Sequence, residues 1–232
     1  MSYFLDAIGW IFAAEHQVGQ NAISARMAEH VFYTVVSLVI ALAIAVPLGY
    51  LIGHTHRGRD LAVGLSGAAR ALPSLGLLTI LTLVFGFSQA SIAAVIVLLL
   101  LGVPSILAGA YSGVQAIDRG TVDAARAIGM TEWQILMKVE IPLGLPILLG
   151  GIRSAALQIV ATATLAAYVG LGGLGVYIFK GLPLRDLQQM LAGAILIAVL
   201  AVTIDVVLAG IQRLATPRGV SAGRTKEFCE RV

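Results

Sequence analysis

The stretch TVDAARAIGMTEWQILMKVEIP, from Thr121 to Pro142, places five charged residues in a chain that is only 12% charged and 59% hydrophobic. Its residue order predicts two helices joined by a turn. Thr121 is a favourable N-cap, and Gly129 suits the left-handed residue that ends a first helix. Thr131 and Gln134 are spaced for a capping box at the start of a second helix, which Pro142 is expected to end.

Apolar runs lie on both sides of this polar stretch. With a mean hydropathy of +0.95, the chain has too few polar side chains to cover a soluble core. About 20 apolar residues span about 30 Å of hydrocarbon as a helix. We therefore expect an all-α integral membrane protein with five transmembrane helices: Val31–Gly53, Leu61–Phe87, Ser91–Tyr111, Leu143–Val169 and Gln189–Arg213. Arg70 and Pro73 interrupt the second of these segments.

The basic residues predict the orientation. Three lie on the side of the N-terminus (Arg26, Lys180 and Arg185), and ten lie on the other side: Arg57, Arg59, Arg119, Arg126, Lys138, Arg213, Arg218, Arg224, Lys226 and Arg231. Since cytoplasmic loops are enriched in Lys and Arg, the second side is expected to be cytoplasmic and the N-terminus outside. The polar stretch then faces the cytoplasm, in a multi-pass protein of the plasma membrane.

Three regions are expected along the chain. Residues 1–28 form an N-terminal segment on the outer side, 29–213 the transmembrane domain, and 214–232 a cytoplasmic tail. In the first region, Phe4, Ile8, Ile11 and Phe12 share one helical face. That pattern fits either a helix in the membrane interface or a short buried packing helix. No signal peptide is predicted, and the single cysteine, Cys229, excludes a disulfide within the chain.

Three interpretations of the polar stretch compete. It can be a plain connector, a DNA-binding helix-turn-helix, or a rigid docking element for a cytoplasmic partner. Asp123 and Arg126 are spaced to pair on the first helix. However, three acidic and two basic residues give the stretch a net charge of −1, and phosphate binding demands the opposite sign. We therefore expect no nucleic-acid partner.

The stretch resembles the cytoplasmic loop of permease subunits of ATP-binding-cassette importers, the binding-protein-dependent (MetI-like) superfamily. Their loop has the pattern E-A-A, three residues, G, nine residues, I-x-L-P. Here Asp123, Ala124 and Ala125 are followed by Gly129 and then, with the same spacing, by Val139-Glu140-Ile141-Pro142. The departures are Asp for Glu, Val for Ile and Ile for Leu.

The resemblance extends over nearly the whole chain and is closest to permeases for osmoprotectants such as glycine betaine, choline, carnitine and proline. The similar stretches include AVPLGYLIG (45–53), ARALPSLGLLTIL (69–81) and GGIRSAALQIVATATLAAYVGLGGLG (150–175). The fold that it implies is five transmembrane helices with a cytoplasmic coupling helix. It also implies that the chain is not itself an enzyme and that it binds no cofactor, because a partner subunit binds and hydrolyses ATP.

The same resemblance assigns partners and site residues. ATPase subunits are expected to dock on the coupling loop through Asp123, Ala124, Ala125, Gly129, Val139, Ile141 and Pro142. A second permease subunit, identical or related, and a separate extracytoplasmic substrate-binding protein complete the importer. Aromatic side chains, which cage quaternary ammonium ligands, are few in the predicted spans. Selectivity is therefore expected to lie mainly in the binding protein.

Other patterns predict no site. The chain lacks the G-x-x-x-x-G-K-[ST] loop that cradles nucleotide phosphates. GLGGLG (170–175) follows an apolar run and is expected to form a flexible or closely packed bend rather than a dinucleotide site. His54 and His56 are too few to hold a metal ion without further ligands, so no metal site is expected.

Three ionisable residues fall inside the predicted spans. Arg70, Arg153 and Asp205 each lie about 12–17 Å along their helices from the cytoplasmic ends, at 1.5 Å per residue. Charges at such depth pair, face a water-filled path or snorkel to the surface. We predict an intramembrane charge network in which Asp205 pairs with Arg153 or, less favourably, with Arg70.

Rival functions remain open. The permease can serve another small solute, such as an amino acid. An ion-driven secondary transporter would carry inverted repeats and broken midplane helices, and no repeat is evident. A non-transporting membrane scaffold would not need the coupling loop.

Overall fold

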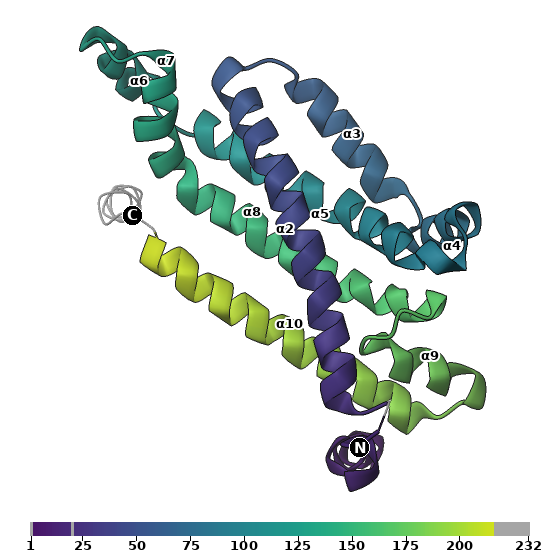
Figure 1. The fold of residues 1–232 in the computed structure, drawn as a ribbon. Coiled ribbons are helices and arrows are strands. Elements are labelled where there is room, and N and C mark those ends of the chain that lie inside the picture. Colours follow the sequence, from purple (N-terminus) through teal and green to yellow (C-terminus); the bar gives the residue numbers. More distant parts are fainter. Residues whose placement is uncertain (1, 20, 216–232) are drawn as a thin grey trace. The chain divides into compact units, whose positions relative to one another are not determined.

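The computed structural model describes residues 2–19 and 21–215, and every regular element in those two ranges is a helix (Figure 1). The predicted all-α class is therefore confirmed. Contacts divide the helices into two compact units, made of the described parts of 1–41, 68–102 and 156–205 and of 42–67, 103–155 and 206–215. Most of the predicted tail, with Cys229, lies outside the described residues. The elements in order are α1 (Ser2–Phe12), α2 (Ile23–Thr55), α3 (Arg59–Ala71), α4 (Ser74–Phe85), α5 (Ala90–Gln115), α6 (Arg119–Ala127), α7 (Glu132–Ile135), α8 (Ile141–Ala163), α9 (Gly175–Leu184) and α10 (Leu187–Ala215).

Among the described residues, four helical stretches are long and apolar enough to cross a bilayer: Ile23–Thr55, Phe87–Gln115, Glu132–Val169 and Leu187–Ala215. Each contains one of the predicted spans. The remaining span is α3 followed by α4, which together have the required length and composition but meet at an angle of 87°. Pro73 explains the break, because its ring disfavours helical geometry at Leu72 and it offers no amide to continue the helix.

Glycines bring the helices of the second unit into backbone contact. Gly49 and Gly53 of α2 lie against α5, where a Cβ on Gly53 would be 2.8 Å from the Cβ of Val114. On the α8 side, α5 offers Gly109, and a Cβ on Gly151 would be 2.9 Å from the Cα of Gly109. Such small-residue faces let helices associate closely in lipid, where apolar burial gives no driving force.

The first unit has its own apolar core and a glycine bend held by the start of α2. Gly170, Gly172 and Gly173 all have positive φ, between 78° and 84°. Glu29 accepts a hydrogen bond from the backbone N–H of Gly173 at 2.7 Å, and a Cβ on Gly172 would collide with the same carboxylate. Of the two alternatives expected at GLGGLG, a flexible or a closely packed bend, the structure has the closely packed one.

His30 holds the same bend from a buried position. Its Nδ1 accepts a hydrogen bond from the N–H of Leu174 at 3.3 Å, and its Nε2 lies 3.0 Å from the carbonyl oxygen of Val160. Because a carbonyl only accepts, the ring is the tautomer with its proton on Nε2. The loop and two helices of the first unit are thereby joined through one side chain.

The N-terminal helix α1 combines features of both expected alternatives. Ala7 is fully buried, and Trp10 and Ile11 pack against the cluster that contains Tyr177. Phe12, by contrast, is 78% exposed. The predicted apolar face is therefore split between packing and exposure, and its placement in the membrane interface stays a prediction.

Candidate functional site

The first helix of the polar stretch begins earlier than predicted. Asp118, rather than Thr121, is the N-cap, and its side chain accepts a hydrogen bond from the N–H of Thr121 at 3.2 Å. The predicted Thr121 cap is therefore wrong. Asp and Thr are both favourable N-cap residues. Asp118 takes the N-cap position because α6 already includes Arg119 and Gly120, which precede Thr121. As a result Asp123 lies in the second turn of α6.

Gly129 makes the turn between α6 and α7. Its φ is +85°, and the N–H of Gly129 and of Met130 donate to the carbonyls of Arg126 and Ala125. These bonds have the pattern of a Schellman motif, which satisfies the last carbonyls of a helix. The predicted left-handed glycine is confirmed.

The start of the second helix agrees with the prediction, whereas its end does not. Thr131 and Gln134 form the predicted capping box at the start of α7. The predicted end at Pro142 is wrong, because a π-helical turn (Leu136–Glu140) leads directly into α8, which begins at Ile141. Pro142 then falls in the first turn of a new α-helix, where its missing N–H is not needed.

A chain of charged side chains holds this helical pair together. Arg126 donates two hydrogen bonds to Glu132, at 2.8 and 3.0 Å, and a third to Asp123 at 3.3 Å. The bonds to Glu132 raise the pKa of Arg126 further above its usual value, so it stays charged at any physiological pH. The predicted pairing of Asp123 with Arg126 is confirmed, and Arg126 additionally ties α6 to α7.

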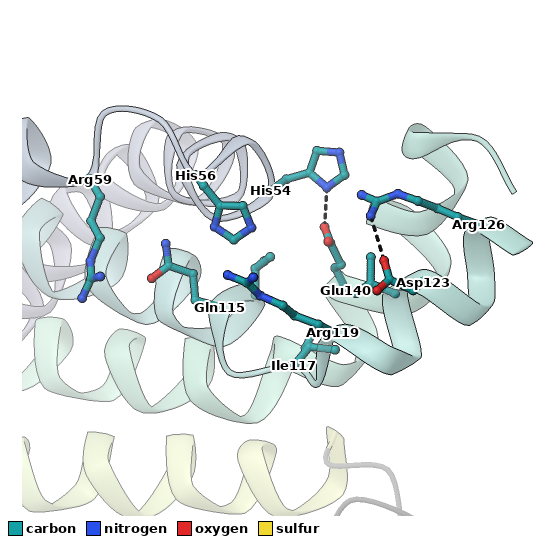
Figure 2. Close-up of a pocket in the computed structure, with 11 residues that line it drawn as sticks. His54, His56, Arg59, Gln115, Ile117, Arg119, Asp123, Arg126 and Glu140 are labelled. Atoms are coloured by element: carbon teal, nitrogen blue, oxygen red, sulfur yellow. Dashed lines mark hydrogen bonds and ion pairs between the residues drawn. The ribbon is translucent and has the colours of Figure 1, made fainter.

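His54, at the end of α2, continues the chain of charges. Its Nδ1 lies 2.6 Å from a carboxylate oxygen of Glu140, and its Nε2 lies 3.5 Å from Glu132. Glu140 is 5% exposed, in the π-helical turn. Sequence reasoning missed this contact because 86 residues separate the two partners. Figure 2 shows the imidazole and the carboxylate facing each other.

A cavity of about 600 Å³ lies beside these charges. Both acids that line it are paired, Asp123 with Arg126 and Glu140 with His54. Within the described ranges, no group of three or more His, Cys, Asp or Glu side chains is placed to hold a metal ion. The other polar side chains drawn around the cavity in Figure 2 are His56, Arg59, Gln115 and Arg119.

The motif residues differ in their exposure. Asp123, Ala124 and Gly129 are exposed, whereas Ala125 is buried beneath α6. The remaining three, Val139, Ile141 and Pro142, are half-buried where the π-helical turn enters α8. The structure therefore presents the first part of the motif to solvent and uses the last part to join the helical pair to a membrane span.

Three large apolar side chains on the same segment are exposed and were not predicted as site residues. Ile128 is 80% exposed, Trp133 65% and Met137 43%. The sequence did contain a pattern that could have indicated them. Ile128 precedes the turn glycine, and Trp133 and Met137 are four residues apart, which places them on the same side of a helix. We name the three the apolar docking patch. Large apolar side chains that stay exposed are candidates for a protein-binding surface.

Arg153, one of the three ionisable residues in the predicted spans, has a polar neighbour. Arg153 donates to the side-chain oxygen of Gln212 at 3.2 Å, and Gln212 in turn donates to the carbonyl of Pro146 at 2.9 Å. Arg153 and Gln212 lie in the second unit, on α8 and α10. The pairing of Asp205 with Arg153 or Arg70 stays a prediction.

Comparison with known proteins assigns this chain to a protein family. Residues 45–219 match the model of the binding-protein-dependent transport system inner membrane component. The chain is 34% identical over 195 residues to the glycine betaine/carnitine/choline transport system permease protein OpuCB of Bacillus subtilis (strain 168), covering 84% of this chain and 89% of that protein. It is 32% identical over 224 residues to the osmoprotectant import permease protein OsmW of Salmonella typhimurium, covering 94% and 97%.

A solved structure supports the fold. The chain matches the MetNI methionine ABC transporter in an inward-facing conformation with a TM-score of 0.74 and 23% identity, covering 84% of this chain and 96% of the matched chain. At this level of identity the match establishes the fold alone. Together with its apolar helices, the family match makes this chain a multi-pass membrane protein. It belongs to the family of binding-protein-dependent transport system inner membrane components.

Proposed function

We propose that this chain is the transmembrane permease subunit of an ATP-driven importer for osmoprotectants of the glycine betaine, choline, carnitine and proline class. The main support for the substrate class is the similarity to OpuCB, which extends over 84% of this chain at 34% identity. The similarity to OsmW, which spans 94% of the chain, supports the same class. ATP is bound and hydrolysed by a partner subunit, and this chain binds no cofactor.

The segment from Asp118 to Pro142 is proposed to dock the ATPase on the cytoplasmic side. Ala124 is small and exposed, which permits close approach, and Asp123 and Gly129 are exposed on the same segment. Val139, Ile141 and Pro142 connect the docked surface to α8 without a loop, so a movement of the segment is passed to a membrane span. A second permease subunit and a separate extracytoplasmic binding protein complete the importer.

The apolar docking patch gives this proposal a direct test. Trp133→Ala removes the largest exposed side chain of the patch, and truncated interface residues of this type weaken binding by about tenfold or more. We expect that loss in the affinity of the purified ATPase for the detergent-solubilised chain. Trp133→Phe, which keeps an aromatic ring, is the matched control. Equal affinity for all three chains would exclude Trp133 from the interface.

The substrate class is tested by uptake. The chain is expressed with its ATPase and binding protein in bacteria that lack their own osmoprotectant uptake, at high osmolarity. Labelled glycine betaine, choline, carnitine and proline are offered separately, with methionine and glutamine as comparisons. We expect uptake of at least one of the first four. Uptake of methionine or glutamine alone would contradict the substrate class and leave the permease function intact.

A further inference from the structure

His54 connects two parts of the second unit that are far apart in the chain. It is the penultimate residue of α2, at the end that the basic residues predict to be cytoplasmic. Its two ring nitrogens face two different carboxylates. One is Glu140, in the π-helical turn that leads into α8. The other is Glu132, on α7, which Arg126 binds from α6. One imidazole therefore contacts the docking segment at two places, on α7 and in the π-helical turn.

The contact with Glu140 is the tight one. The carboxylate is 5% exposed, and its only ion pair or hydrogen bond through the side chain, among the residues that the structure describes, is with His54 at 2.6 Å. A buried carboxylate without a partner is strongly unfavourable, so Glu140 holds the imidazole in place. By contrast, His56 lines the same cavity and makes no hydrogen bond or ion pair within the described residues. Burial and pairing thus single out one of the two histidines.

We propose that His54 is a positioning residue of the transport cycle, which ties α2 to the docking segment so that the two move together. The inference rests on the proposed docking of the ATPase on that segment. The segment is continuous with α8 along the backbone, but no short covalent path joins it to α2, since 86 residues separate His54 from Glu140. The imidazole supplies the missing link, and a displacement of the docked segment then moves α2 as well as α8.

The test uses the full chain with its ATPase in liposomes, supplied with binding protein and labelled glycine betaine. The measured quantity is substrate taken up per ATP hydrolysed. For His54→Leu we expect this ratio to fall at least about fivefold, the lower end of typical couplings between sites. ATPase binding and hydrolysis should persist. His54→Gln, which can still donate to Glu140, should restore most of the ratio. His56→Asn, a residue type that tolerates the positive φ of 56°, should leave it unchanged.

A double variant separates positioning from simple charge balance. His54→Leu/Glu140→Leu leaves no buried carboxylate unpaired, so a merely structural role predicts that the uptake ratio returns to the wild-type value. Positioning predicts a chain that assembles normally and stays uncoupled. If the His54→Leu protein does not accumulate in the membrane, the uptake ratio of the double variant is measured instead. A wild-type ratio in the double variant, or in His54→Leu, would overturn the proposal. Failure of the wild-type chain to bind any ATPase would instead overturn the docking on which it rests.

Discussion

Gly129→Val is expected to abolish substrate uptake while the chain still inserts in the membrane. A Cβ on this glycine would have no atom within 4 Å, so the substitution causes no clash. The effect comes from the backbone, because a left-handed residue with a β-branched side chain costs about 1–2 kcal/mol or more. The turn relaxes to another conformation, and the Schellman bonds of Gly129 and Met130 are lost. The helix α7 then leaves the position in which we propose that the ATPase docks on it.

The matched control is Gly129→Asn, since asparagine adopts left-handed conformations readily. We expect Asn to keep most of the uptake and Val to keep none, at equal amounts of protein in the membrane. Co-purification of the ATPase with each variant locates the defect. Normal uptake in Gly129→Val would contradict the role of the turn, and equal losses in both variants would point to the side chain rather than the backbone.

Gly151→Ala should destabilise the second unit, whereas Gly150→Ala should not. A Cβ on Gly151 would lie 2.7 Å from the carbonyl oxygen of Ser105, so α5 and α8 must move apart. The nearest such contact at Gly150 is 4.0 Å, to the side chain of Gln212. Overpacking typically costs about 1–3 kcal/mol. The same substitution in an uncrowded helix gains up to about 1 kcal/mol from helix propensity.

Thermal unfolding of the two variants in detergent provides the measurement. We expect a lower midpoint for Gly151→Ala than for wild type, and an equal or higher midpoint for Gly150→Ala. Because the substitutions are adjacent and chemically identical, their difference reports packing alone. Equal midpoints would show that the helices do not approach at Gly151 as closely as the structure has them.

The sequence predicted the features that are encoded locally. Twenty-residue apolar runs identified the spans, and Pro73 marked the place where one of them is broken. The capping box of Thr131 and the left-handed Gly129 followed from residue types with a strong conformational preference. Each of these depends on a few neighbouring residues, which is why a single sequence was enough.

The errors arose where two local preferences compete or where partners are distant. Asp118 and Thr121 both make good caps, and nothing local decides between them. A proline usually ends a helix, but here a π-helical turn places Pro142 at the start of another helix, α8. The pairing of His54 with Glu140 was out of reach, because a single sequence carries no signal for a contact across 86 residues.

We propose that a partner ATPase, rather than an ion gradient, drives solute through this chain. The direct measurement is uptake of labelled glycine betaine into liposomes that contain the chain and its ATPase, with binding protein outside. We expect uptake only when ATP and Mg²⁺ are present on the ATPase side, and we expect it to be unchanged by ionophores that collapse ion gradients. Uptake without ATP, driven by an imposed proton or sodium gradient, would contradict it.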